Sequence, residues 1–330
     1  MTAGARRRTP RDPCAPSASP ADRKRTARSV AVGDVRYAVR TCGDGPPLVL
    51  LHGYTGSSAL WTALAAQLAP NFRCIAIDLL GHGDSSAPPD PARYAMAATL
   101  TDLAGLFDAL GLERAALLGY SMGGRVALAF AIEHPQRVTA LLLEGASPGL
   151  ADAGERAARA SADAALAARI TRDGTDAFID TWMAQPLFAS QARLDADTRA
   201  RARRQRAANS ALGLAASLRG LGSGAQPSYW HRLHELTMPV LLLAGADDAK
   251  FQALARAMAR RIADATLQPI AAAGHATHLE QPAAFAHAVE AFLAQRLQRS
   301  ARRPINVDAR PPPTEASTAM RPTTASATEE

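Results

Sequence analysis

The chain has 330 residues, of which 48 % are hydrophobic and 20 % are charged, with a formal net charge of +7. This length and composition are those of a globular protein that can bury one large core or two smaller ones. The longest apolar runs, such as residues 47–51, fall far short of the roughly 20 residues that a membrane-spanning helix needs. A fibrous chain and a membrane partner are therefore not expected.

The positive charge lies at the two ends of the chain. Residues 1–30 carry eight Lys or Arg against two Asp or Glu, and residues 299–330 carry five against four. Residues 31–298 are therefore neutral overall, whereas a nucleic-acid groove needs a basic surplus within the folded part. We expect no nucleic-acid partner.

Both ends are predicted to be disordered tails. Residues 1–30 and 299–330 are rich in Pro, Ala, Thr, Ser and Arg and poor in aromatic residues. Residues 1–30 also lack the continuous apolar stretch of a secretory signal. The three cysteines Cys14, Cys42 and Cys74 show no paired metal-ligand spacing, which indicates reduced thiols in the cytoplasm.

Between the tails, short apolar strand patterns alternate with longer helical patterns rich in Ala and Leu. Several strands are almost wholly apolar, as strands buried on both faces must be. The alternation predicts an α/β fold with a mostly parallel sheet and helices on both faces. The predicted strands are 35–41, 47–51, 73–77, 115–118, 138–144, 240–243 and 266–270, and the predicted helices are 57–68, 95–110, 122–133, 250–262 and 280–298.

The alternation breaks between residues 151 and 235, where three helical patterns follow one another without a convincing strand. This insertion divides the core into residues 31–150 and 236–298. Because it leaves one strand at Glu144 and returns to another at Val240, it should cover the carboxyl edge of the sheet, where such sheets bind ligands. We interpret it as a helical lid.

A candidate nucleophile follows the fourth predicted strand. The run Gly119-Tyr120-Ser121-Met122-Gly123 matches Gly-x-Ser-x-Gly, in which small residues let a strand and a helix approach around a strained serine. A strand is predicted before this run and a helix after it, as the motif requires. The pattern therefore predicts an α/β-hydrolase fold with Ser121 as the catalytic serine.

A serine needs a neutral imidazole to accept its proton and a carboxylate to orient that imidazole. In this fold the acid and then the histidine follow the serine along the chain, and Asp248 and His275 each come just after a predicted strand. Asp247 competes for the role of the acid, and Glu144 is a further alternative. His278 lies three residues after His275, but no Glu or Cys at metal-ligand spacing accompanies it, so we expect no metal.

Two backbone N–H groups are candidates for an oxyanion hole. The turn that contains His52-Gly53-Tyr54 follows a buried strand and can present the N–H of Tyr54, while the turn at Ser121 presents that of Met122. Donors of this kind stabilise negative charge that develops on a substrate oxygen.

Over about residues 45–290 the sequence resembles the 2-succinyl-6-hydroxy-2,4-cyclohexadiene-1-carboxylate synthases, α/β hydrolases of menaquinone biosynthesis. The residues that carry the resemblance are Gly119-Tyr120-Ser121-Met122-Gly123-Gly124-Arg125, residues 144–150, Glu155-Arg156 with Arg159, Trp182 with Gln185-Pro186-Leu187-Phe188, residues 245–251, and Ala273-Gly274-His275. The serine turn is common to many hydrolases. The lid motifs and the Asp248-Ala249-Lys250-Phe251 segment are more specific.

The resemblance implies a lyase reaction in place of hydrolysis, in which a base removes a proton alpha to a succinyl ketone and pyruvate is eliminated from the ring. It also implies a small-molecule substrate with several carboxylates. The substrate-binding residues that it implies are Arg125, Arg159, Arg206, Trp182 and Tyr120. The sequence contains no Gly-x-x-x-x-Gly-Lys-Ser/Thr or Gly-x-Gly-x-x-Gly motif for a nucleotide, so we expect no cofactor. Because the lid is about three residues longer after Phe188 than in the family, Arg203 is an alternative to Arg206.

Two other functions fit the same motifs. One is a carboxylesterase or C–C bond hydrolase that uses Ser121, Asp248 and His275, for which arginines facing the pocket have no purpose. The other is a binding protein on this fold, which the complete set of catalytic residues disfavours. We expect a cytoplasmic monomer or weak homo-oligomer.

Overall fold

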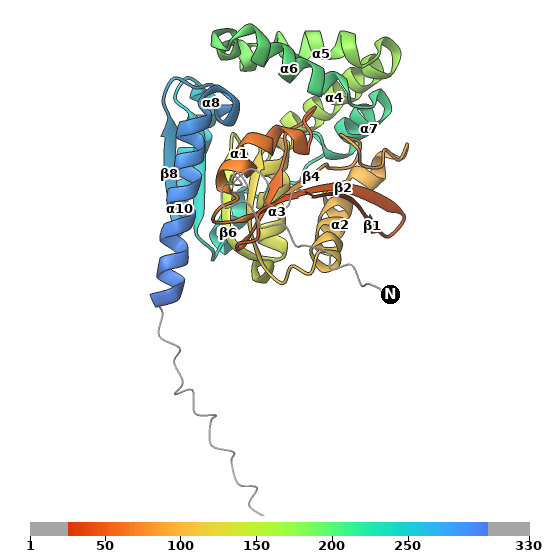
Figure 1. The fold of residues 1–330 in the computed structure, drawn as a ribbon. Coiled ribbons are helices and arrows are strands. Elements are labelled where there is room, and N and C mark those ends of the chain that lie inside the picture. The colour runs from red at the N-terminus through yellow and green to blue at the C-terminus, as the bar shows by residue number, and fades with distance from the viewer. Residues whose placement is uncertain (1–25, 303–330) are drawn as a thin grey trace, which may run out of the picture.

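An eight-stranded sheet runs through residues 26–302, the part of the chain that this computed structural model describes (Figure 1). The strand order is β1-β2-β4-β3-β5-β6-β7-β8; β1/β2 and β2/β4 are antiparallel and the other pairs are parallel. The seven predicted strands are confirmed, with ends that shift by at most two residues. The strands are β1 (Thr26–Val32), β2 (Val35–Cys42), β3 (Pro47–Leu51), β4 (Arg73–Ile77), β5 (Ala115–Tyr120), β6 (Val138–Glu144), β7 (Val240–Gly245) and β8 (Ala265–Ile270).

Helices cover both faces of the sheet, as the sequence predicts. The last predicted helix, 280–298, is confirmed as α10 (Pro282–Arg302), and a separate single turn, α9 (Thr277–Glu280), precedes it; Pro282, which has no backbone N–H, begins the new helix. The other helices of the core are α1 (Thr62–Leu68), α2 (Met96–Ala109), α3 (Met122–Glu133) and α8 (Ala249–Ala259). Short 3-10 turns lie at Ser58–Trp61, Pro91–Tyr94 and Pro135–Arg137.

The two cores follow from the two-residue period of the strands. In β3, Val49 and Leu51 pack in the cluster that contains α2, α3 and α8, while Leu48 and Leu50 pack in the cluster that contains α1 and α10. Successive side chains of a strand point to opposite faces, so an unbroken apolar run fills both clusters. The sheet is thereby held rigidly beneath the site.

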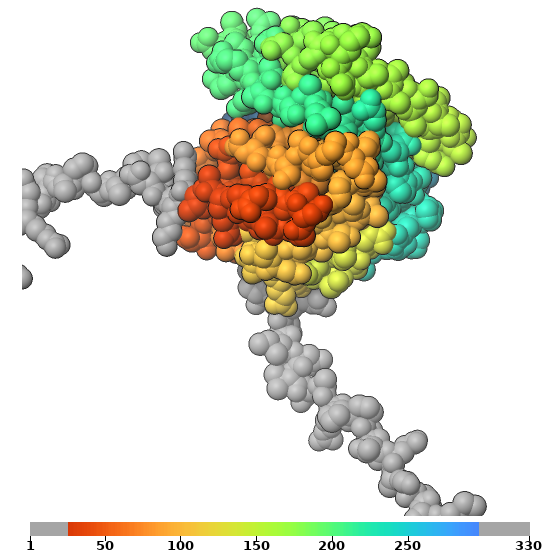
Figure 2. Space-filling view, turned by 90° about the vertical axis from the view of Figure 1, so that its right-hand side faces the viewer, coloured from red at the N-terminus to blue at the C-terminus, as the bar shows by residue number. Residues whose placement is uncertain are grey.

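The segment between β6 and β7 forms the lid. Its helices α4 (Ala153–Asp173), α5 (Thr175–Met183), α6 (Ala196–Ala207) and α7 (Ala211–Leu221) lie together above the sheet in Figure 1, and Figure 2 shows the green lid as a layer over the orange core. Two 3-10 segments, Pro186–Arg193 and Trp230–Glu235, complete it. The three predicted helical patterns form four α-helices, because Asp195 and Ser210 cap the N-termini of α6 and α7 with their side chains.

The first predicted tail ends earlier than residue 30. Strand β1 begins at Thr26 and pairs with β2 from Thr26 opposite Thr41 onwards. Its first four side chains are exposed and only Val30 is buried, so this edge strand has the composition of a tail although its backbone is paired. Similarly, α10 extends to Arg302. The remaining tail predictions, for residues 1–25 and 303–330, lie outside the described residues.

No helix within residues 26–302 is both long enough and apolar enough to cross a membrane.

Candidate active site

Ser121 occupies a sharp turn between β5 and α3. Its backbone lies in the left-handed region, with φ 50° and ψ −107°, which is strained for a residue other than glycine. A Cβ atom on Gly119 would overlap the carbonyl of Gly123, and one on Gly123 would overlap the carbonyls of Leu51 and His52. The close approach of strand and helix therefore requires glycine at both positions, and it exposes the serine hydroxyl at the end of β5.

The structure brings Ser121, His275 and Asp248 together. The Oγ of Ser121 lies 3.2 Å from Nε2 of His275, whose Nδ1 lies 2.9 Å from Oδ2 of Asp248. His275 and Asp248 are buried, and the other oxygen of Asp248 accepts from the backbone N–H of Phe251, so the carboxylate also caps α8. This is the arrangement in which an imidazole takes the serine proton while a carboxylate fixes its tautomer.

The two alternative acids have other partners. Asp247 is 43 % exposed and forms an ion pair with Arg193 of the lid at 2.7 Å. Glu144 is fully buried and accepts from the hydroxyl of Thr277 at 2.6 Å and from Nδ1 of His278 at 2.8 Å. Neither carboxylate is bonded to His275. Among residues 26–302, no group of three or more His, Cys, Asp or Glu has a metal-binding arrangement.

The proposed oxyanion donors lie beside Ser121. The Cβ position of Gly53 is 3.4 Å from Cβ of Ser121, which places the turn before Tyr54 against the serine. Met122 is the first residue of α3, so its N–H has no acceptor within the helix. Nδ1 of His52 donates to the carbonyl of Gly53 at 2.8 Å, and this carbonyl belongs to the same peptide group as the N–H of Tyr54. His52 therefore fixes the direction of one donor.

The residues around this turn reach into the lid. The carbonyl of Thr55, a residue with φ 66°, accepts from the side chain of Asn209 at 2.8 Å. The hydroxyl of Tyr54 donates to the carbonyl of Leu214 at 3.0 Å. Beneath them, burial lowers the pKa of His52, and it lowers the pKa of His82 to about 3. The turn is thus supported by neutral imidazole rings from below and by lid contacts from above.

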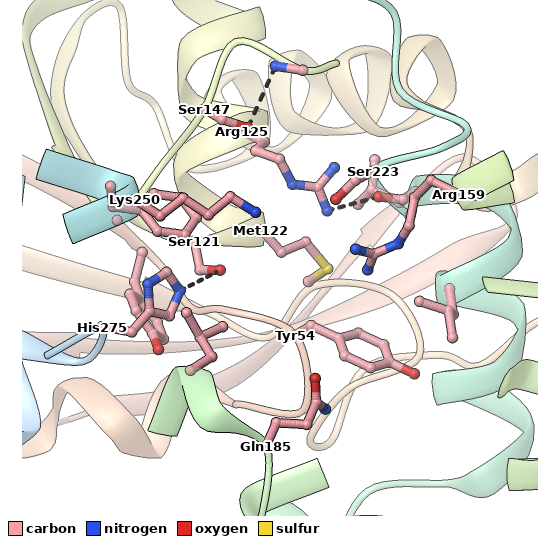
Figure 3. A pocket seen from close by; sticks show the side chains of 18 of the residues that line it. Tyr54, Ser121, Met122, Arg125, Ser147, Arg159, Gln185, Ser223, Lys250 and His275 are labelled. Atoms are coloured by element: carbon pink, nitrogen blue, oxygen red, sulfur yellow. Dashed lines mark hydrogen bonds between the residues drawn. The ribbon is translucent and has the colours of Figure 1, made fainter. Parts of the chain in front are cut away.

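A cavity of about 460 Å³ opens above the serine, between core and lid. Figure 3 shows Ser121 and His275 at one side of it, with Arg125, Arg159 and Lys250 around it. Among the described residues that line it there are these three cations and no Asp or Glu. Further lining residues include Tyr54, Tyr120, Met122, Ser147, Trp182, Gln185, Phe188, Ser217, Ser223 and Phe251. The walls thus combine apolar surface, hydroxyl groups and positive charge.

Arg125 is the most deeply placed of the three cations. It lies one turn into α3, is 8 % exposed, and donates to Oε1 of Gln226 at 2.6 Å and to the carbonyl of Leu221 at 2.9 Å. Burial lowers its pKa to about 10; the positive charge of Arg159 contributes in the same direction and Asp163 opposes it. At neutral pH the guanidinium is therefore charged, and its two acceptors are neutral.

Arg159 and Lys250 are held differently. Nε of Arg159 donates to Asp163 at 2.7 Å, and the arginine side chain is 43 % exposed. Lys250 follows Asp248 by two residues at the start of α8 and points its amine into the cavity in Figure 3. We did not predict a role for Lys250, although the segment that contains it was part of the resemblance.

One predicted arginine does not reach the cavity wall. Arg125, Arg159, Trp182 and Tyr120 all line the cavity, but Arg206 does not; it is buried in the lid and its Nη1 donates to the carbonyl of Ala202 at 3.1 Å. Its alternative Arg203 is also elsewhere, in ion pairs with Asp180 and Asp176. Six of the twelve residues of α6 are charged and none is a large apolar residue, so no apolar pattern indicates which of its sides turns inward.

Comparison with known proteins supports the fold and identifies similar proteins within the α/β hydrolases. The family described as alpha/beta hydrolase fold matches residues 46–282. A Bacillus subtilis protein named as a candidate 2-succinyl-6-hydroxy-2,4-cyclohexadiene-1-carboxylate synthase is 45 % identical over 270 residues, which cover 80 % of this chain and 97 % of the relative. The synthase of that name from Serratia proteamaculans is 35 % identical, over 76 % and 94 % of the two chains.

Solved structures agree with this pattern. The structure of MenH from S. aureus superposes with a TM-score of 0.76 at 32 % identity, over 78 % of this chain and 98 % of that one. A thermophilic esterase from Thermogutta terrifontis, with malate bound, has a TM-score of 0.72 at 29 % identity, over 83 % and 99 %. The backbone alone therefore does not separate a synthase from an esterase, and the residues of the cavity must do so.

Proposed function

Because this chain belongs to the 2-succinyl-6-hydroxy-2,4-cyclohexadiene-1-carboxylate synthase family of α/β hydrolases, we propose that it is a carbon–oxygen lyase of menaquinone biosynthesis. Its substrate is a succinyl-cyclohexene carboxylate that carries an enolpyruvyl group, and its products are pyruvate and 2-succinyl-6-hydroxy-2,4-cyclohexadiene-1-carboxylate. The protein acts in the cytoplasm as a monomer or weak homo-oligomer. The free thiols of Cys42 and Cys74, on neighbouring strands, are consistent with a reducing compartment.

The observation that carries this proposal is the charge of the cavity. Arg125, Arg159 and Lys250 line it without a lining carboxylate, and Arg125 is buried with neutral acceptors only. A buried charge is costly unless an anion approaches it, and a guanidinium binds carboxylates well. A neutral ester has no use for such a site, whereas a substrate with several carboxylates does.

The geometry supports proton abstraction from carbon as the first step. His275 accepts the proton of Ser121, and the serine oxygen removes the proton alpha to the succinyl ketone. The N–H groups of Tyr54 and Met122 stabilise the enolate oxygen. When the ketone re-forms, the bond between the ring carbon and the enolpyruvyl oxygen breaks, and pyruvate leaves as its enolate. That enolate takes up one proton, so no proton is consumed overall.

The test is incubation with the enolpyruvyl-bearing intermediate, with pyruvate measured against substrate consumed. We expect one pyruvate per substrate, no acyl-enzyme burst, and loss of the reaction in Ser121→Ala and His275→Ala. Absence of pyruvate from the wild-type enzyme would contradict the proposal.

A second candidate function is ester hydrolysis, which the likeness to the Thermogutta terrifontis esterase favours. Ser121 would then form an acyl-enzyme, detectable as a burst with p-nitrophenyl esters. Rapid turnover of neutral esters that does not depend on Arg125 would support this function over the lyase.

A further inference from the structure

We propose that Gln226, a residue of the lid outside the cavity wall, determines the preference of the site for a multiply anionic substrate by holding Arg125 with a neutral acceptor. This inference rests on the polycarboxylate substrate of the proposed function. It assigns to Gln226 a positioning role, because its side chain contacts the arginine and does not line the cavity.

Gln226 is fixed between α7 and the following 3-10 segment. It is 1 % exposed, and its backbone N–H donates to the carbonyl of Gly222 at 3.1 Å. A guanidinium has only donors, so the oxygen of the Gln226 amide must face Arg125, and the two atoms lie 2.6 Å apart. The Nε2 atom of Gln226 has no hydrogen-bond partner within the described part of the chain. Among the described residues, the bond from Arg125 to Oε1 is therefore the one hydrogen bond of this side chain.

The second acceptor of Arg125 is also neutral. The carbonyl of Leu221 ends α7, where the unsatisfied carbonyls of a helix attract positive charge. The arginine of core helix α3 thus binds the C-terminal end of lid helix α7. Two hydrogen bonds fix the direction of the guanidinium, but neither acceptor carries a negative charge that would neutralise it.

The nearby carboxylate is already engaged. Oδ1 of Asp163 accepts from Nε of Arg159 at 2.7 Å, and neither of its oxygens is bonded to Arg125. Arg125, Arg159 and Asp163 together carry two positive charges and one negative charge on this side of the cavity. The net charge of +1 is available to a ligand. A carboxylate in place of the Gln226 amide would have nearly the same shape, would pair with Arg125 and would compete with a substrate carboxylate.

The decisive variant is Gln226→Glu, which changes the charge at nearly constant shape. The probe is tricarballylate, a three-carboxylate anion, measured by its protection of Ser121 against labelling by a neutral fluorophosphonate. We expect protection in the wild type and at least a tenfold higher concentration for half-protection in Gln226→Glu. With the pathway intermediate, KM should rise at least tenfold while kcat changes by less than about threefold.

The matched control is Gln191→Glu. Gln191 is also a buried glutamine of the lid, but it makes no hydrogen bond to Arg125. This control should keep the wild-type protection curve. An equal loss in both variants, or no loss in Gln226→Glu, would overturn the inference.

A second variant covers the case in which Gln226→Glu does not fold. Gln226→Met removes the acceptor without adding charge, so the tricarballylate concentration for half-protection should rise by about threefold, because one of the two hydrogen bonds that fix Arg125 is lost. An unchanged concentration would overturn the positioning role, and a rise of tenfold or more would mean that neutrality is not what matters. The proposed function fails separately. A wild-type enzyme that tricarballylate protects but that releases no pyruvate would refute the lyase and leave this inference standing, whereas pyruvate release without protection would refute the inference alone.

Discussion

The core wall and the lid wall of the cavity are built by different means. On the core wall, Ser121, Asp248 and His275 each sit just after a strand, where the backbone fixes the position of the side chain. On the lid wall, Arg159 and Trp182 are placed by which side of a helix faces inward, whereas Arg206 is buried within the lid and does not line the cavity. The comparison teaches that the proposed catalytic groups are anchored by local backbone geometry, while the proposed substrate-binding groups of the lid depend on helix packing.

The largest effects should come from the core wall. Ser121→Ala, Asp248→Asn and His275→Ala should each lower kcat/KM for pyruvate release by about 10³-fold or more, and paired substitutions should not add, since the three groups act as one unit. Asn can still cap α8 at position 248, so the melting temperature should change little. Fully additive losses would mean that the three side chains do not work together.

Smaller effects are expected from the three cations around the substrate. Ala at Arg125, Arg159 or Lys250 should remove charge-assisted hydrogen bonds and lower kcat/KM roughly 10- to 150-fold, measured on the pathway intermediate. Arg203→Ala is the control on the lid, because its ion pairs with Asp176 and Asp180 are exposed. Indifference of the enzyme to Arg125→Ala would mean that the core wall supplies catalytic groups but no charge for the substrate.

The boundary between the walls should be sensitive to acid. The folded-state pKa of His82 is about 3, below its unfolded value of about 6.5, so below pH 6.5 the unfolded chain binds a proton that the folded chain refuses. The free energy of unfolding should therefore decrease as the pH is lowered, by about 2 kcal/mol from pH 7 to pH 5 for this residue alone. Urea unfolding of His82→Phe should show a pH dependence smaller by about that amount; an unchanged dependence would contradict the neutral buried ring.

The smallest effect on stability should come from the exposed ion pair between the lid and the core. Asp247→Asn breaks the ion pair with Arg193, whose partners are 43 % and 54 % exposed, so stability should change by less than about 1 kcal/mol. Pyruvate release should stay within about threefold of wild type. A loss as large as that of Asp248→Asn would transfer the role of the acid to Asp247.

Much of the fold could be predicted because its signals are local. Strands such as Pro47–Leu51 are apolar on both faces, and the Gly-x-Ser-x-Gly turn admits few conformations. The misplaced N-terminal boundary has a physical cause: β1 is an edge strand whose pairing uses its backbone, which composition does not reveal.

More of the core wall than of the lid wall could be predicted from the sequence. Position after a strand indicated Asp248 and left Asp247 as a competitor, and the structure pairs Asp248 with His275. The run of arginines in α6 carried no such constraint, since five arginines within residues 199–206 give no sign of which one is buried. Lys250 lies in a segment that carries the resemblance, but no sequence pattern indicated that its amine points into the cavity. Gln226 lies 101 residues from Arg125, and no local pattern connects them.

Tyr54 makes the lid a poor candidate for exchange between relatives. Its main chain offers an N–H beside Ser121, but its ring packs against Phe178 and Trp182 and its hydroxyl donates to Leu214. A chimaera that kept this core and took residues 151–235 from another hydrolase would leave that ring without its packing and its acceptor. The transplanted lid would then alter the turnover of every substrate, including those small enough never to touch it. Grafts at this site need Tyr54 and its lid partners moved together.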